Sequence, residues 1–424
     1  MAVHIPPSRP RTPPHGVRGP APHPVRRRAG LRVLIGTDTY PPDVNGAAYF
    51  TARLARGLSQ RGVDVHVLCP SPDGPPQVVR CDGVVEHRLR SMSSLVHESV
   101  RLPLPPGVGG HLDRLLSRLR PDVVHVQNHF IAGRMLLRAA RSRDVPVLAT
   151  NHFMPENLFD YLKVPAPLRR GMSAFAWHDF CRVLGAVDHM TTPTRTAARL
   201  LLDKGFEQPV EAVSCGIDLG RFRPLGDEAR DELRALLGIP DRPTIAFVGR
   251  LDAEKHIDDL ISALPMVRPD DAQLVIAGVG AQRQRLARLA ESEGVAGRVR
   301  FLGFVPNDDL PSAYRAADVF AIAGTAELQS IATLEAMASG LPIVAANAMA
   351  LPHLVQAGHN GYLYPPGDTP ALAAHLSRIL TAPTARRDRM GRASRTMAAV
   401  HDHENSVARF EGIYRELARA HAGR

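Results

Sequence analysis

Short apolar runs alternate along the chain with longer stretches in which apolar residues recur at helical spacing. The run LRVLIGT (31–37) is rich in branched residues and ends at a cluster of Pro, Asp and Gly, which is typical of a buried parallel strand. The next stretch, AAYFTARLARGLSQRG (47–62), has the spacing of an amphipathic helix that stops at Gly62. VDVHVLCP (63–70) then predicts a second strand.

The same alternation continues along most of the chain. DVVHVQ, VPVLATNH and VDHMTTPT predict more strands of the first sheet, and turn residues cluster at 211–224, where this series closes. A second series has strands at PTIAFVGR, AQLVIAGVG, RVRFLGFV, ADVFAIAG and LPIVAAN. Repeated strand-helix-strand units form parallel sheets covered on both faces. We therefore predict an α/β fold with two doubly wound, Rossmann-like domains facing a cleft at the carboxyl ends of their strands.

We expect four segments in the chain. Residues 1–30 are rich in Pro and Arg, contain no acid and lack the apolar block of a signal peptide, so we predict a disordered tail. Residues 31–215 and 216–395 are the two predicted domains. Residues 396–424 are predicted to form a helix that packs back on the first domain. Two-domain clefts close around their ligands, and we place the hinge near 211–224.

Composition excludes some classes of protein. Apolar residues make up 44% of the 424 residues, but no apolar run approaches the roughly 20 residues that a membrane span needs. Cysteines are few and lack metal-ligand spacing, which favours reduced thiols in a cytoplasmic protein. They are Cys69, Cys81, Cys181 and Cys215. The net charge of +10 favours an anionic partner, which could be a nucleotide, a phospholipid surface or a nucleic acid.

Two cations follow the first predicted strand of the second domain, in AFVGRLDAEKH (246–256). The chain has only three lysines, at Lys163, Lys204 and Lys255, so a lysine in this loop stands out. Arginine binds phosphate oxygens through a planar fork, whereas lysine supplies a mobile point charge. We interpret Arg250 and Lys255 as an anion site at the cleft edge. The alternative is that Lys255 is an exposed, solubilising residue.

Two glutamates lie eight residues apart in GTAELQSIATLEAMASGLP (324–342), across a predicted strand-to-helix junction. The helix is predicted to begin near Ser330, where free N–H groups and the positive end of the helix dipole favour a diphosphate. Glu335, inside the helix, could accept hydrogen bonds from ribose hydroxyls. Glu327, before the helix, could face a sugar.

Taken together, these motifs resemble the family 4 retaining glycosyltransferases of the GT-B fold, over nearly all of the chain beyond residue 30. The resemblance rests on four motifs in order: PPDVNGAA (41–48), AVSCGIDLGRFRP (212–224), VGRLDAEKH (248–256) and an E-x7-E pair with LEAMASGLPIVA (334–345). It implies transfer of a hexose from a UDP- or GDP-sugar to a hydroxyl acceptor.

The resemblance also implies roles for single residues. Arg250 and Lys255 look like the pair that binds the donor diphosphate and stabilises it as it leaves. Glu335 looks like the ribose ligand, and Glu327 like the first glutamate of the pair, near the donor sugar.

Three further residues are assigned to the donor site by the resemblance. Gly46 is similar to the glycine whose small size lets the first-domain loop approach the diphosphate. Ser330 and Ile331, at the predicted helix start, look like donor contacts. Ser330 takes a position where many members of the family have glycine, which leaves the choice of donor open.

His129 and His152 follow predicted first-domain strands. Each could assist at the reaction centre, and each could equally be a histidine that caps a strand end. No Asp-x-Asp motif occurs, so no metal clamp is expected. The resemblance implies chemistry without metal or cofactor, in which the acceptor attacks from the front face and the departing phosphate takes its proton.

The acceptor is not fixed by the sequence. Residues 157–182 mix aromatic and aliphatic side chains with Lys163, Arg169 and Arg170, which suits a lipid acceptor at the inner face of a membrane. The same stretch also fits an ordinary helix-loop-helix packed on the sheet. Enzymes of the resembled family modify soluble sugars, inositols and antibiotic precursors as well.

Three other functions compete with glycosyl transfer. A nucleotide-sugar epimerase could share the paired-domain fold, although the order of the motifs favours transfer. A basic protein that binds a membrane or nucleic acid would leave the cleft unused. Since every cleft motif is present, we expect no nucleic acid partner. NAD-dependent oxidoreduction is disfavoured because no G-x-G-x-x-G follows 31–37.

Overall fold

The structure is a computed structural model that describes residues 30–43, 45–93, 101–103, 108–158, 164–225 and 227–423. Nearly all of the predicted tail at 1–30 lies outside the described residues, as does Lys163. Residues Leu31–Arg424 form one structural unit.

The first predicted series of strands forms a sheet of eight described strands in the order β10-β9-β8-β7-β1-β2-β4-β3. Its strands are β1 (Arg32–Gly36), β2 (Asp64–Pro70), β3 (Gln77–Cys81), β4 (Val84–Leu89), β7 (Val123–Val126), β8 (Val147–Thr150), β9 (His189–Thr192) and β10 (Val210–Ala212). All pairs are parallel except β3 with β4. A separate hairpin joins β5 (Ser91–Ser93) to β6 (Arg101–Pro103). Strands β7 and β8 are buried on both faces, which explains their continuous apolar runs.

The second series forms a fully parallel sheet of six described strands in the order β13-β12-β11-β14-β15-β16. They are β11 (Thr244–Val248), β12 (Gln273–Ala277), β13 (Val299–Gly303), β14 (Val319–Ile322), β15 (Ile343–Ala346) and β16 (Gly361–Tyr364). The prediction of two doubly wound α/β domains is thus confirmed.

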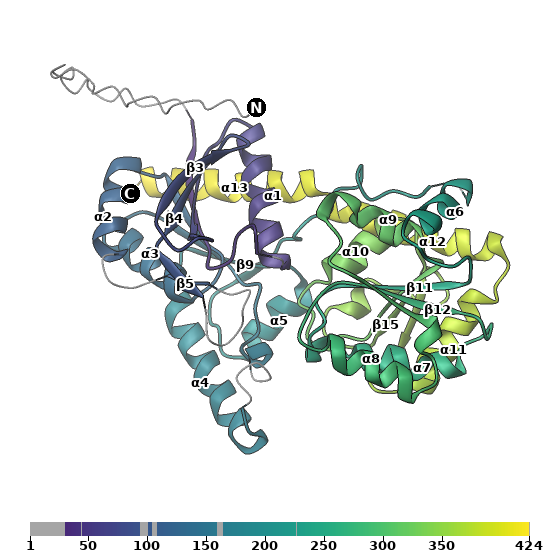
Figure 1. Ribbon diagram of the computed structural model, residues 1–424. Helices are drawn as coiled ribbons and strands as arrows, with labels where there is room; N and C mark the ends of the chain where they lie inside the picture. The colour runs from purple at the N-terminus through teal and green to yellow at the C-terminus, as the bar shows by residue number, and fades with distance from the viewer. Residues whose placement is uncertain are drawn as a thin grey trace, which may run out of the picture. The chain divides into compact units, whose positions relative to one another are not determined.

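Helices connect the strands and cover both sheets (Figure 1). In the first domain they are α1 (Gly46–Gln60), α2 (Val108–Leu119), α3 (Ile131–Arg141), α4 (Ala166–Leu184) and α5 (Arg195–Asp203). In the second they are α6 (Asp227–Leu236), α7 (Ile257–Ala263), α8 (Arg283–Ser292), α9 (Leu310–Arg315), α10 (Ile331–Ala338), α11 (Thr369–Leu380) and α12 (Thr384–Ala398). The last helix is α13 (His403–Ala422).

Helix α13 packs against α1 of the first domain and crosses it (Figure 1). The rings of Phe50 and Phe410 lie 5.6 Å apart, and a Cβ at Gly57 would come within 2.7 Å of Val407. The chain crosses between the domains twice, and a backbone hydrogen bond joins the two crossing segments. Ile217 donates its N–H to the carbonyl of His401 at 2.8 Å. Both ends of the second domain are therefore tied to the first through adjacent backbone.

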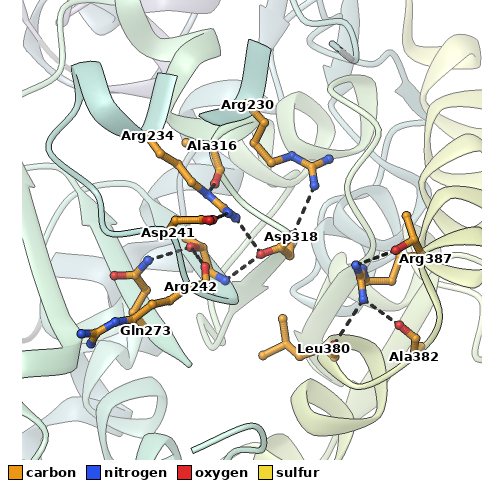
Figure 2. A network of polar contacts seen from close by, with 12 residues as sticks. Arg230, Arg234, Asp241, Arg242, Gln273, Ala316, Asp318, Leu380, Ala382 and Arg387 are labelled. Atoms are coloured by element: carbon orange, nitrogen blue, oxygen red, sulfur yellow. Dashed lines mark hydrogen bonds and ion pairs between the residues drawn. The ribbon is translucent and has the colours of Figure 1, made fainter. Parts of the chain in front are cut away.

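A buried ion-pair network closes the amino-terminal edge of the second sheet (Figure 2). Arg234, on α6, donates to Asp318 at 2.8 Å and to Asp241 at 2.7 Å, and its Nε donates to the carbonyl of Ala316 at 3.0 Å. Asp318 also accepts the N–H of Thr244 at 2.8 Å. Since the network lies at the amino ends of β11 and β14, opposite the edge where parallel sheets bind ligands, its role is structural.

Candidate functional site

A cavity of about 1940 Å³ opens at the carboxyl ends of strands from both sheets. The first domain contributes the start of α1 and the residues that follow β7 and β8, among them Gln127 and His152. The second domain contributes Arg250 after β11, Gly278 after β12, and Glu327 with α10 after β14. The cleft thus lies where doubly wound sheets bind ligands.

Arg250 and Lys255 both line this cleft and are held by acids. The Lys255 ammonium donates to Glu327 at 2.7 Å and lies 3.3 Å from Glu254. Arg250 lies 2.6 Å from a carboxylate oxygen of Asp252 and 3.1 Å from Glu254. Burial disfavours the charge on Lys255, but the two glutamates outweigh burial and raise the pKa of the lysine above its usual value. The predicted cations therefore meet at one site, and Lys255 is not an exposed, solubilising residue.

Helix α10 begins at Ile331, beside the predicted position. The Ser330 side chain caps it by accepting the N–H of Thr333 at 3.3 Å. A Cβ at Gly46 would lie 3.4 Å from the Ile331 side chain, so the starts of α1 and α10 face each other across the cleft. Gly46, Ser330 and Ile331 all line it, with Glu327 on the loop before the helix.

Glu335 lies in the second turn of α10 and is buried at the cleft wall. The hydroxyl of Tyr314 donates to its Oε2 at 2.7 Å, which leaves Oε1 for a ligand. Burial raises the pKa of Glu335, while the Tyr314 hydrogen bond and the charges of Arg53 and Arg221 oppose that rise.

His152 lines the cleft but both of its ring nitrogens face protein groups. Nε2 lies 2.7 Å from Oε1 of Gln127, and Nδ1 lies 3.9 Å from the thiol of Cys215. Because the Gln127 oxygen can only accept, the network assigns the proton to Nε2. Burial lowers the pKa of His152 to about 4, so the ring is neutral at pH 7.

The side chain of His129 is not brought to the cleft with the other predicted residues. It is buried, stacked on Phe130 at 4.8 Å and set edge-on to Phe180 at 5.0 Å. Its imidazole ring lies in an aromatic cluster with Phe130 and with Phe180 of α4, which holds it in the core.

Sequence reasoning missed several cleft residues. Gln127 stands in HVQNHF and Arg221 in GIDLGRF, so both lay within stretches that were already singled out. Arg53, on α1, was interpreted only as one charged residue of an amphipathic helix, although it lies two turns after Gly46. Tyr314 does not line the cleft itself but contacts Glu335, and it had no local signal because the two residues are 21 positions apart.

Two further observations bear on the class of protein. Among the described residues, no three or more His, Cys, Asp or Glu side chains gather as metal ligands would. Nor does any described helix combine the length and apolar composition that crossing a bilayer requires.

Comparison with known proteins identifies the family. The model of Glycosyltransferase Family 4 matches residues 44–221, and that of Glycosyl transferases group 1 matches 229–397. A GDP-mannose-dependent alpha-mannosyltransferase of Mycobacterium tuberculosis is 31% identical over 86% of this chain and 93% of its own length. A D-inositol 3-phosphate glycosyltransferase of Catenulispora acidiphila is 31% identical over 96% of this chain and 99% of its own. An alpha-monoglucosyldiacylglycerol synthase of Streptococcus pneumoniae is 28% identical over 83% and 79%.

Solved structures share the fold. Sucrose-phosphate synthase from Thermosynechococcus elongatus aligns with a TM-score of 0.76 at 21% identity, over 92% of this chain and all of that one. Anabaena HepE, solved with UDP and glucose, aligns with a TM-score of 0.72 at 17% identity, over 91% of this chain and all of that one. Fold and site together define a glycosyltransferase with the GT-B architecture. The chain belongs to Glycosyltransferase Family 4 and is a hexosyltransferase.

Proposed function

We propose that this enzyme moves a hexosyl group from a UDP- or GDP-sugar to a hydroxyl acceptor, with retention of configuration and without a metal ion. The observation that carries the proposal is the half-buried Lys255 ammonium, which lies with Arg250 at the cleft edge. Preorganised cations of this kind stabilise the charge that develops on a departing diphosphate. The donor class is supported by the name of the mannosyltransferase relative and by the UDP in the HepE structure.

In the proposed reaction the diphosphate takes the place of a carboxylate beside Lys255. Glu327, released from the lysine, then accepts a hydrogen bond from a sugar hydroxyl. The bond between the anomeric carbon and the diphosphate oxygen breaks, and the acceptor oxygen bonds to that carbon on the same face. The acceptor's proton passes to the departing phosphate oxygen. No protein nucleophile takes part, and Oε1 of Glu335 holds a ribose hydroxyl.

Transfer assays with a panel of UDP-, GDP-, ADP- and dTDP-sugars test this proposal. The assays run in the presence of a chelator, with lipid extracts and soluble sugars as acceptors. We expect turnover of one donor and a product whose anomeric configuration, read by NMR, matches that of the donor. An inverted product, or activity that requires added metal, would contradict the proposed chemistry.

We also propose that the acceptor is a lipid reached at an anionic membrane surface. Leu168, Met172 and Phe175 are 58%, 39% and 74% exposed, and their spacing places them on one side of α4. Arg169 and Arg170 are exposed beside them, and no acid occurs between 164 and 178. An exposed apolar stripe with exposed cations next to it in sequence, and no acid over the same stretch, fits anionic lipid headgroups. The name of the diacylglycerol-modifying relative supports a lipid acceptor.

Vesicle sedimentation tests the membrane proposal. We expect the protein to sediment with vesicles containing phosphatidylglycerol and not with pure phosphatidylcholine, and the double variant Leu168→Ser/Phe175→Ser to lose this binding. Transfer to a soluble acceptor should not change in the variant, because neither side chain lines the cleft. Equal sedimentation with both kinds of vesicle would contradict the role of anionic lipid, and sedimentation with neither would favour a soluble acceptor.

A further inference from the structure

Two arginines in the cleft have no assigned role in the proposed reaction. Arg53 lies on α1 of the first domain, and Arg221 lies in the crossing after β10; both line the cleft. Arg53 donates one bond, from Nη2 to the carbonyl of Gly216 at 3.2 Å. Its Nε, and Nη2 of Arg221, are buried with no hydrogen-bond partner among the described residues. Buried donors without a partner are costly, so these nitrogens indicate a missing ligand.

Unlike Arg53 and Arg221, the cations of the proposed diphosphate site already have carboxylate partners. Lys255 and Arg250 each contact two carboxylates within 3.3 Å. An anion that binds there must displace a carboxylate, whereas one that binds at Arg53 and Arg221 satisfies open donors. The two pairs of cations are therefore separate binding elements of one cleft.

The position of Arg53 follows from the two facing helices. Gly46 of α1 faces Ile331 of α10, and Arg53 lies seven residues further along α1, a rise of about 10 Å. Glu335 lies four residues further along α10. The charges of Arg53 and Arg221 both lower the pKa of Glu335. The Glu335 carboxylate in turn raises the pKa of the half-buried Tyr49, one turn before Arg53. The cluster thus combines guanidinium donors with a carboxylate acceptor.

We infer that Arg53 and Arg221 form a second anion site in the cleft, which binds the phosphate of a polyol phosphate whose hydroxyls bond to Glu335. Guanidinium groups match phosphate oxygens, and a carboxylate accepts from hydroxyls. The inference rests on the proposed function, which makes Glu335 a hydroxyl ligand. The phosphate belongs either to the donor nucleotide or to a phosphorylated acceptor.

Calorimetric titration of the full chain separates these two sources. The probes are GDP, UDP and glycerol 3-phosphate, titrated into wild type, Arg53→Gln and Arg53→Lys. Arg56→Gln is the matched control, since Arg56 also lines the cleft from the same helix, three residues on, but is exposed and already pairs with Asp82 at 2.7 Å. We expect Arg53→Gln to weaken one probe about tenfold or more, Arg53→Lys to recover most of that loss, and Arg56→Gln to change binding less than twofold.

Each outcome decides the inference. A loss confined to GDP or UDP assigns the site to the donor, and one confined to glycerol 3-phosphate assigns it to the acceptor. The inference is overturned if Arg53→Gln binds every probe like wild type. It is also overturned if Arg53→Lys loses as much affinity as Arg53→Gln and both variants melt at a lower temperature, because Arg53 then only holds Gly216 in place. If wild type binds no nucleoside diphosphate but binds glycerol 3-phosphate through Arg53, the anion site stands and the proposed function fails.

Discussion

The Lys255 ammonium and the Glu327 carboxylate lie 2.7 Å apart at the cleft edge, so the two groups form an ion pair in the proposed site before a donor binds. A buried lysine without a partner would lose its proton, but two glutamates keep this one charged. The charge is thus in place before a diphosphate binds, so little reorganisation is needed as the leaving group departs.

Tyr314 offers a prediction at the residue scale. In Tyr314→Phe, Glu335 loses the hydrogen bond that lowers its pKa, and burial then raises that pKa further. Ligand binding that needs the ionised carboxylate is present above this pKa and is lost as pH falls through it. We therefore expect the affinity for GDP or UDP to fall off at a higher pH in the variant than in wild type, so that the variant binds more weakly at the acidic end of the range. Calorimetric titration from pH 5 to 8 measures this, and coincident profiles would contradict the role of Tyr314.

At the scale of elements, Arg234 ties α6 to the edge of the second sheet (Figure 2). Its side chain is only 8% exposed, and Arg234→Ala would leave buried Asp318 with fewer donors. We expect the free energy of unfolding to fall by about 3–5 kcal/mol. Turnover per folded molecule should not change, because the network lies at the edge opposite the cleft.

Denaturant unfolding measures that effect, with Arg268→Ala as the control. Arg268 pairs with Asp270 at 2.6 Å, but the two side chains are 60% and 80% exposed. Such a surface pair contributes about 1 kcal/mol or less. If both variants lost the same free energy of unfolding, burial would not explain how much the Arg234 network stabilises the fold.

Elements with a strong period could be predicted from the sequence, and contacts between distant elements could not. The run at 31–37 and the stretch at 47–62 became β1 and α1 within two residues at either end, because apolar periodicity determines the buried face. Ser330 capped α10 as its residue type favours. The partner of Glu335 lies on another helix, and the side chain of His129 turned into the core. Neither contact leaves a local pattern.

At the scale of the whole molecule, buried histidines predict acid sensitivity. Burial lowers the pKa of His87, His129, His152 and His401 to about 4, from 6.5. Between these values the unfolded chain binds protons that the folded chain does not, so stability falls as pH drops from 6.5 towards 4. Asp38, whose pKa burial raises to about 6, acts in the opposite direction, and so do three further carboxylates whose pKa burial raises, Asp43, Asp259 and Glu335. These carboxylates are outnumbered, because burial also lowers the pKa of His66, His111, His125, His353, His375 and His403.

Denaturant unfolding at pH 7 and pH 5 checks this balance. We predict a lower free energy of unfolding at pH 5 than at pH 7. Equal or greater stability at pH 5 would mean that the histidines are not buried as neutral groups.

We also predict that the two domains close around a bound nucleotide. The paired crossings at Ile217 and His401 leave the domains joined by two adjacent strands of backbone, which suits a hinge. X-ray scattering should show a smaller radius of gyration with a bound nucleoside diphosphate than without it. An unchanged radius would argue against closure.

The most direct test of the central claim is the turnover of the preferred nucleoside diphosphate sugar by wild type and by Lys255→Ala. Lys204→Ala serves as the control, since Lys204 is exposed, pairs with Glu156 at 3.5 Å and does not line the cleft. We predict that Lys255→Ala lowers kcat by about 100-fold or more, the size of effect seen when a preorganised charge is removed, while Lys204→Ala stays within twofold. Turnover in Lys255→Ala equal to that of wild type would contradict the account.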